Sequence, residues 1–225
     1  MRVLTIDIGN TSTKAALFGP DGGMTLVESL NGVAYDRAIA CVSGKADGLP
    51  ADVQQLGPDT EVPIAVAYDR AALGPDRLAA ACGAWALAGG ADCVVVDAGT
   101  CITVDLVRSG TYVGGAIMPG IAMQLQALHS HTAHLPQIGM EQMAVDNTAG
   151  GDTAQSIALG VGQGTVCAIE GLTSRYEADG KCRLFLTGGN AAMLQRCGLW
   201  QGREHSLQPS LVLYGLYRIT QCNLK

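Results

Sequence analysis

The chain has 225 residues, of which 48% are hydrophobic and 15% charged, and its formal net charge is -6. A charged fraction below the usual value of about 25% favours a globular protein whose surface is partly covered in an oligomer. No basic stripe occurs, so no nucleic-acid partner is expected. The absence of a leader pattern and of a membrane-length apolar run predicts a cytoplasmic protein with no membrane partner.

The first part of the chain is rich in short apolar runs bounded by turns. The runs that predict strands lie at 2–8, 14–18, 24–29, 38–43 and 63–66. Asp21-Gly22-Gly23 separates two of them and is typical of a hairpin turn. The first three strands therefore form an antiparallel meander, and the last two are expected to be buried parallel strands.

The remainder alternates helical and strand patterns. Helices are predicted at 77–89, 120–129, 153–177, directly after Asn190 and at 209–221, and strands at 93–97, 101–107, 111–117 and 183–187. Each part thus begins with a three-stranded meander and continues with helices and strands. This repeated α/β pattern fits two ribonuclease-H-like, actin-like ATPase lobes with mixed five-stranded sheets and an interlobe cleft. The expected lobes are 1–74 plus 209–225, and 75–208.

Eight cysteines are scattered along the chain without a C-x-x-C pair. That distribution favours reduced thiols in an intracellular compartment. Cys82, Cys93 and Cys167 lie in apolar stretches and are expected to be buried.

One short motif occurs twice, each time after an apolar strand: Asp7-Ile8-Gly9-Asn10-Thr11 and Asp97-Ala98-Gly99-Thr100. A tight turn of this kind exposes backbone N–H groups, and its glycine lets a phosphate approach closely. Lys14 adds a positive charge near the first copy. Asp7 would repel a phosphate and fits only if it faces a hydrated Mg²⁺. The alternative is an ordinary hairpin turn, but the repetition favours a pair of phosphate-binding turns.

Gly74-Pro75-Asp76-Arg77 precedes an alanine-rich helix. The simpler interpretation is a helix start, with Pro75 in the turn and Asp76 as the cap. The functional interpretation makes Asp76 a general base and Arg77 a bidentate partner for a substrate carboxylate. Asp105, on the strand after the second repeated motif, is interpreted as an outward-facing residue without a role.

Two further clusters have alternative interpretations. Thr187-Gly188-Gly189-Asn190 follows an apolar strand, and it is either a surface for a flat base or ribose or a plain strand-to-helix turn. His129, His131 and His134 suggest a metal site, but their spacing favours a solvated helix face.

In this order and spacing, the motifs resemble those of the type III pantothenate kinases, which are related to acetate kinases, sugar kinases and actin. The matching segments are Asp7-Ile8-Gly9-Asn10-Thr11 with Lys14, Tyr68 with Leu73-Gly74-Pro75-Asp76-Arg77, Asp97-Ala98-Gly99-Thr100, Gly114-Gly115-x-Ile117-x-Pro119-Gly120 and Thr132-Ala133-x-Leu135-Pro136. Cys101 departs from the family, which usually has alanine there. The chain is also short for the family, and the shortening falls between 30 and 68.

The resemblance implies ATP-dependent phosphorylation of pantothenate to 4'-phosphopantothenate, the first step of coenzyme A biosynthesis, by a homodimer. It implies Asp76 as the general base, and a pantothenate pocket lined by Tyr68, Gly74, Pro75 and Arg77. The residues implied for Mg-ATP are Asp7, through water on the metal, and Gly9, Asn10, Thr11, Lys14, Gly99 and Thr100. A monovalent cation, K⁺ or NH₄⁺, is implied near Asp97. The partner subunit would donate Thr153 to the pantothenate site, with Thr148 as the weaker candidate.

Two other functions remain open on the sequence. One is a non-catalytic transcriptional accessory factor of the same family, which the intact Asp7, Asp76 and Asp97 argue against. The other is a sister kinase that acts on a sugar or acyl substrate.

Overall fold

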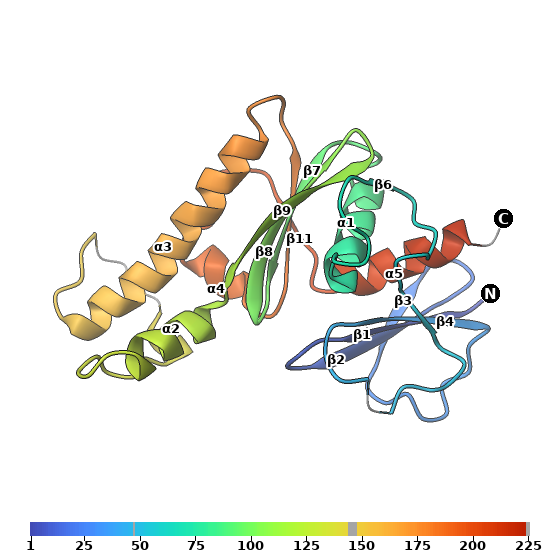
Figure 1. Cartoon of the computed structure of the whole chain (residues 1–225), viewed down its shortest axis with the longest axis horizontal. Coiled ribbons are helices and arrows are strands. Elements are labelled where there is room, and N and C mark those ends of the chain that lie inside the picture. The colour runs from blue at the N-terminus through green and yellow to red at the C-terminus, as the bar shows by residue number, and fades with distance from the viewer. Residues whose placement is uncertain (47, 144–147, 224–225) are drawn as a thin grey trace. The chain divides into compact units, whose positions relative to one another are not determined.

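The computed structural model of the protein describes residues 1–46, 48–143 and 148–223. Its contacts group into two compact units (Figure 1). Unit 1 contains 1–93, 105–114 and the segment that begins at Ser210, and unit 2 contains 94–104 and 115–209. The lobe division expected from the sequence, 1–74 plus 209–225 against 75–208, stays a prediction.

The five-stranded sheet of unit 1 has the strand order β3-β2-β1-β4-β5. Its strands are β1 (Val3–Ile8), β2 (Thr13–Phe18), β3 (Met24–Val27), β4 (Arg37–Val42) and β5 (Gln54–Gln55). β1 pairs antiparallel with β2 and parallel with β4, and β2 pairs antiparallel with β3. The predicted meander is confirmed, and its hairpin turn uses Gly22 at a φ of 80°.

Alternation along β1 decides which side chains meet the helices. Leu4 and Ile6 belong to a core cluster that partly buried side chains from the following loops cover, including Leu30 and Leu49. Val3 belongs to the opposite cluster, together with Phe18 and Leu213 of helix α5 (Leu211–Cys222). Because side chains alternate across a strand, Asp7 lies on the same face as Val3, the face against which α5 packs.

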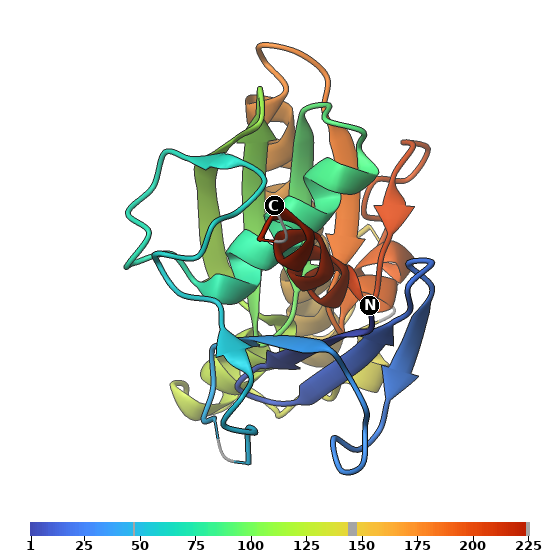
Figure 2. The same ribbon diagram turned by 90° about the vertical axis from the view of Figure 1, so that its right-hand side faces the viewer.

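Helix α1 (Pro75–Leu87) packs closely against α5 in unit 1, and the two helices are seen side by side in both views (Figure 1, Figure 2). A Cβ added at Gly83 would lie 2.8 Å from the carbonyl oxygen of Leu211. One added at Gly215 would collide with the carbonyl oxygen of Ala79. The small residues of α1 and α5 therefore permit a backbone approach that larger side chains would block.

The second sheet has the strand order β11-β10-β7-β8-β9-β6. Its strands are β6 (Ala65–Val66), β7 (Cys93–Ala98), β8 (Cys101–Arg108), β9 (Thr111–Pro119), β10 (Arg183–Thr187) and β11 (Ser206–Leu207). The turn between β8 and β9 uses Ser109 and Gly110 at positive φ angles of 48° and 69°. This sheet has six strands rather than the expected five, because two short edge strands, β6 and β11, complete it.

The run at 63–66 is the clearest error of the strand predictions. Only Ala65 and Val66 form a strand, β6, which pairs in parallel with β9. The expected parallel pairing is confirmed, but Ala65 is exposed, so the expected burial is wrong. Pro63 has no N–H to donate to a strand ladder. The fifth strand of the first sheet is instead β5, whose two glutamines give no hydrophobic pattern.

The remaining helices agree with the predictions. They are α2 (Ile121–Ser130), α3 (Thr153–Tyr176) and α4 (Ala191–Arg196). A short 3-10 helix (Met140–Gln142) was not predicted. Asp152 caps α3 by accepting a hydrogen bond from the backbone N–H of Gln155 at 2.8 Å. None of the described helices combines the length and apolar character needed to cross a bilayer.

All eight cysteines are free. Cys82 and Cys93 are buried as expected, but the expectation for Cys167 is wrong because it is exposed on α3.

Candidate functional site

The first repeated motif forms a compact turn at the end of β1. The backbone N–H of Gly9 donates to the carbonyl oxygen of Ser12 at 3.0 Å, while Ser43 and Gly44 donate to the carbonyl of Ile8 at 2.9 and 3.1 Å. A Cβ at Gly44 would collide with the carbonyl oxygen of Gly9. Asn10 is exposed at the tip of the turn. Close backbone approach, which only glycine allows, therefore shapes this turn.

Asp7 lies between two cross-strand neighbours. Lys14 is opposite it on β2, and Cys41 is opposite it on β4. The Cys41 thiol donates a hydrogen bond to Oδ1 of Asp7 at 3.0 Å. Burial raises the pKa of Asp7 above its ordinary value, the thiol and Lys14 oppose this, and the charge of Asp76 adds to it. Burial also raises the pKa of the Cys41 thiol, and the charge of Asp7 strengthens this.

The second repeated motif forms a similar turn, but different neighbouring residues surround it. The backbone N–H of Gly99 donates to the carbonyl oxygen of Cys101 at 2.9 Å, and Gly120 donates to that of Thr100 at 3.1 Å. Asn190 donates from its backbone to Ala98 at 2.9 Å. The Asn190 side chain donates to the carbonyl of Gly99 at 3.3 Å.

Gly188 packs directly against this second turn. Its φ is 92°, and an added Cβ would lie 2.5 Å from both the Ala98 carbonyl carbon and Oδ1 of Asp97. The motif Thr187-Gly188-Gly189-Asn190 is therefore part of the Asp97 turn. The sequence suggested two separate motifs, because nothing in it indicates that β10 lies beside β7.

Asp76 lies in the first turn of α1, where Gly74 is the N-cap residue and Pro75 follows it. The prediction of Asp76 as the cap is thus wrong. Oδ1 of Asp76 accepts a hydrogen bond from the backbone N–H of Arg77 at 2.8 Å. A Cβ at Gly74 would lie 2.7 Å from that oxygen, so the glycine leaves room for the carboxylate. Since the charge of Asp76 acts on the pKa of Asp7, these two predicted site residues are electrostatic neighbours.

Arg77 forms a buried ion pair with Asp105, with side chains only 8% and 2% exposed. Nη2 of Arg77 lies 2.5 Å from Oδ1 of Asp105, and Nε lies 3.3 Å from Oδ2. The interpretation of Asp105 as outward-facing is therefore wrong. Val104, Leu106 and Val107 are buried too, so β8 has no exposed face there, and alternation could not reveal that Asp105 points inward.

Two tyrosines complete this cluster. The Tyr112 hydroxyl donates to Oδ1 of Asp105 at 2.8 Å. The Tyr68 and Tyr112 rings each lie 6.0 Å from Cζ of Arg77, within the range of a cation–π contact. Tyr68 is 40% exposed, whereas Tyr112 is fully buried. We refer to Arg77, Asp105, Tyr112 and Tyr68 as the arginine cluster.

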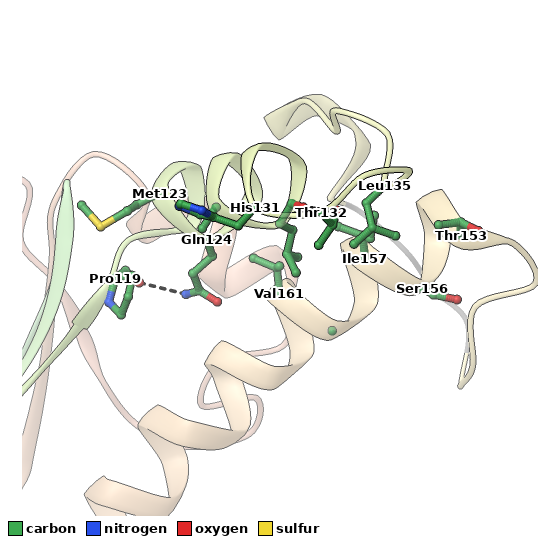
Figure 3. Close-up of a pocket in the computed structure, with 13 residues that line it drawn as sticks. Pro119, Met123, Gln124, His131, Thr132, Leu135, Thr153, Ser156, Ile157 and Val161 are labelled. Carbon is green, nitrogen blue, oxygen red and sulfur yellow. Dashed lines mark hydrogen bonds between the residues drawn. The ribbon is translucent and has the colours of Figure 1, made fainter.

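Thr153 lies in a separate place in unit 2, at the first position of α3. It contributes to an open, mainly apolar groove of about 870 Å³ between α2 and α3. Figure 3 shows Thr153 and Ser156 at one end of the groove and Pro119 and Met123 at the other. Thr148, the weaker candidate, is exposed and does not line the groove.

The histidine cluster does not form a metal centre. His129 lies near the end of α2, and its Nδ1 contacts the carbonyl oxygen of Leu135 at 2.9 Å. Within 1–46, 48–143 and 148–223, no three His, Cys, Asp or Glu side chains lie together as a metal site.

The structure thus groups the predicted residues locally. Asp7, Lys14 and Asp76 are neighbours, Tyr68 and Gly74 lie around Arg77 and Asp76, and Gly99 and Thr100 form one turn with Asn190. The sequence reasoning missed contributors that carry no recognisable motif: Cys41, Gly44, Asp105 and Tyr112. The functional roles of all these residues stay predictions.

Comparison with known proteins identifies the family. The family model for type III pantothenate kinase matches residues 46–175, more than half of the chain. A type III pantothenate kinase of Porphyromonas gingivalis is 33% identical, over 98% of this chain and 98% of its own.

Solved structures support the fold alone. A conserved putative Baf family transcriptional activator from Campylobacter jejuni superposes with a TM-score of 0.63 at 23% identity, over 98% of both chains. A putative 2-dehydro-3-deoxygalactonokinase from Sinorhizobium meliloti gives 0.58 at 13% identity, over 99% of both. The predicted ribonuclease-H-like, actin-like ATPase fold class is confirmed by these likenesses and the two sheets. On the family match and the full-length relative, this chain belongs to the type III pantothenate kinase family.

Proposed function

We propose that the protein is a pantothenate kinase, which transfers the γ-phosphate of ATP to the primary hydroxyl of pantothenate and forms 4'-phosphopantothenate for coenzyme A synthesis. Family membership supports this activity. The observation that carries it is the first turn of α1, where Asp76 directly precedes Arg77 and acts electrostatically on Asp7. A base, a carboxylate-binding group and a metal-facing carboxylate are the groups that this transfer needs.

The two repeated turns are proposed to hold the ATP phosphates. Gly9, Asn10, Thr11 and Lys14 would contribute from the first turn, and Gly99 and Thr100 from the second. Backbone N–H groups in such turns bind anions without a net positive charge on the protein. That suits a chain whose formal net charge is -6.

The surroundings of Asp7 fit a hydrated Mg²⁺. Burial destabilises its charged form, and a nearby cation would stabilise that form. When bound, Mg²⁺ neutralises charge on the phosphates. We assign a monovalent cation, K⁺ or NH₄⁺, to the neighbourhood of Asp97 by resemblance to the family.

The chain's own side chains then divide the chemistry. Asp76 orients the pantothenate hydroxyl and accepts its proton. Arg77 binds the pantothenate carboxylate, with Tyr68, Gly74 and Pro75 lining the pocket. Positioning of this kind is the main contribution of a protein to phosphoryl transfer.

A coupled ADP-release assay with pantothenate tests this function. We expect Asp76→Asn to lower kcat by a factor on the order of 10²–10⁴, because it removes the proton acceptor while preserving shape. The matched control is Asp69→Asn, which changes an exposed carboxylate that only accepts a hydrogen bond from Ala71. Full turnover by Asp76→Asn would remove Asp76 as the base.

The same assay separates the competing functions. Sugars and acetate are offered in place of pantothenate, and a preference for one of them would indicate a sister kinase. No ADP release with any acceptor would favour a non-catalytic accessory factor.

We further propose a cytoplasmic homodimer in which Thr153 acts on the partner's pantothenate site. Thr153→Ala should raise the pantothenate KM, whereas Thr148→Ala should not. Mixing Asp76→Asn subunits with Thr153→Ala subunits provides the sharper test. Hybrid dimers would contain one site with both residues intact, so activity should exceed that of either variant alone. No gain on subunit exchange would contradict donation across the dimer.

A further inference from the structure

The arginine cluster contains a carboxylate and a phenol to which the proposed function gives no role. We propose that Asp105, supported by Tyr112, is a positioning residue that fixes the Arg77 guanidinium for the substrate carboxylate. This inference rests on the proposed function, because it assumes that Arg77 binds the carboxylate of pantothenate.

The contacts of the cluster limit the movement of the guanidinium: Asp105 binds one edge of it, and two tyrosine rings lie near it. The two carboxylate oxygens of Asp105 accept hydrogen bonds from Nε and Nη2 in a bidentate arrangement. The rings of Tyr68 and Tyr112 each lie 6.0 Å from Cζ and meet each other edge-on, at an interplanar angle of 79°. Because the long side chain is already ordered, substrate binding would lose less conformational entropy.

The same contacts leave a defined part of Arg77 for a ligand. Nη1 has no hydrogen-bond partner among the described residues. The Arg77 side chain keeps an exposed fraction of 8%. Asp105 therefore occupies the Nε edge and leaves the Nη1 end for a substrate carboxylate.

The charges of the cluster explain why Tyr112 is needed. Burial lowers the pKa of Arg77, but Asp105 outweighs it and holds that pKa above its ordinary value, so Arg77 stays charged. A buried pair is unfavourable unless further hydrogen bonds satisfy it. Burial and the charge of Asp105 raise the pKa of Tyr112, which keeps its hydroxyl protonated as a donor. Tyr112 thereby completes the environment of Asp105.

The test compares pantothenate with its alcohol analogue, in which the carboxylate is reduced to a primary alcohol. In Asp105→Asn, the amide N–H group either faces a donor of Arg77 or turns away from it. In both cases the guanidinium loses its fixed position. We expect the pantothenate KM to rise about 10- to 100-fold, with a smaller fall in kcat. The KM of the alcohol analogue should change little, because that analogue has no carboxylate.

Three variants make the result specific. Tyr112→Phe removes one hydrogen bond and should raise the pantothenate KM by a smaller factor. Asp105→Glu, which keeps the charge, should restore part of the loss. Asp92→Asn is the matched control, since Asp92 pairs with Arg108 of the same strand, β8, outside the cluster.

A double-mutant cycle completes the test. In an Arg77→Ala background, Asp105→Asn should add no further increase in the pantothenate KM. Additive increases, or equal increases for pantothenate and the alcohol, would overturn the positioning role. If Asp105→Asn does not fold, Tyr112→Phe carries the same comparison. An unchanged pantothenate KM in Arg77→Ala would overturn the assignment of Arg77 to the substrate carboxylate. If Arg77→Ala raised this KM but Asp105→Asn did not, only the positioning role of Asp105 would be overturned.

Discussion

The two Asp-x-Gly turns show how the same short motif is built in two ways. β1 and β7 have the same sequence of buried and half-buried positions, with Asp7 and Asp97 each half-buried near the strand end. The turns differ in closure, because Gly9 donates to Ser12 whereas Gly99 donates to Cys101, one position nearer. The motif thus determines the strand and its acidic residue, and the length of the turn is set locally.

The surroundings of the two turns differ more than the turns themselves. Side chains act on Asp7, through Lys14 on β2 and the thiol of Cys41 on β4. Backbone encloses the Asp97 turn, through Gly120 and Gly188. We infer that close backbone packing shapes both turns and that the side chains of Lys14 and Cys41 additionally act on the first.

The largest expected effect comes from removing either acidic residue. Asp7→Asn and Asp97→Asn should each lower kcat about 10²- to 10³-fold, because each removes electrostatic stabilisation at the phosphates. Titrations with Mg²⁺ and with K⁺ distinguish the two. The Asp7 variant should need more Mg²⁺, and the Asp97 variant should lose its response to K⁺. The same cation profile for both variants would break the comparison.

Glycine-to-alanine substitutions compare how closely the backbone packs around each turn. Gly188→Ala should reduce the free energy of unfolding by about 1–3 kcal/mol or more, because alanine is strained at that φ and also meets Ala98. The neighbouring Gly189→Ala has open space and no positive φ, so it should change little. Thermal unfolding measures both.

The corresponding change in the first turn is Gly44→Ala, with Gly57→Ala as its control. Gly44 has no positive φ, so its cost should come from the collision with Gly9 and should be smaller than that of Gly188→Ala. A larger loss for Gly44→Ala would contradict the additional cost assigned to the positive φ of Gly188.

The pH dependence should reveal the burial of Asp7. Its pKa lies above the ordinary value of 3.8, so the carboxyl takes up a proton at a higher pH than an exposed aspartate would. At low Mg²⁺, activity should therefore fall on acidification through this raised pKa, and high Mg²⁺ should move the fall to lower pH. The folded state takes up this proton first, so the Asp7 contribution to stability increases as pH falls through that window. If the pH at which activity falls on acidification (the acid limb) did not depend on the Mg²⁺ concentration, this prediction would be contradicted.

The smallest expected effect is that of Cys41. Cys41→Ala removes the thiol donor that lowers the pKa of Asp7, so the acid limb should move to higher pH. A hydrogen bond of this kind contributes about 0.5–1.5 kcal/mol, which limits the change in rate to roughly tenfold. Cys41→Ser keeps a donor and should leave the limb near its original position. Equal shifts in both variants would indicate a packing effect instead.

Much of the fold follows from local patterns in the sequence. Alternation and turn residues predicted β1 to β4 and β7 to β10, and the long helical periodicities predicted α1, α3 and α5. β5, β6 and β11 were missed or misjudged because each has two residues and depends on a neighbouring strand for its existence. Tertiary pairing, rather than local preference, decides such short strands.

The candidate site was predictable where a residue type implies a chemistry. The Asp-x-Gly repeats and the Asp76-Arg77 pair are of this kind. Asp105 was not predictable, because it lies within a strand buried on both sides and its charged partner, Arg77, is far away in sequence. Alternation along β8 places its side chain on one face, and Arg77 of α1 supplies the ion-pair partner there.

The contact between α1 and α5 has a consequence for how the protein is made. Asp76 and Arg77 belong to a helix whose Ala79 and Gly83 lie against residues 211 and 215. During translation, this helix leaves the ribosome long before its packing partner is synthesised. Asp76 and Arg77 therefore acquire their final packing support only when α5 has emerged. A nascent chain that lacks α5 is expected to be inactive.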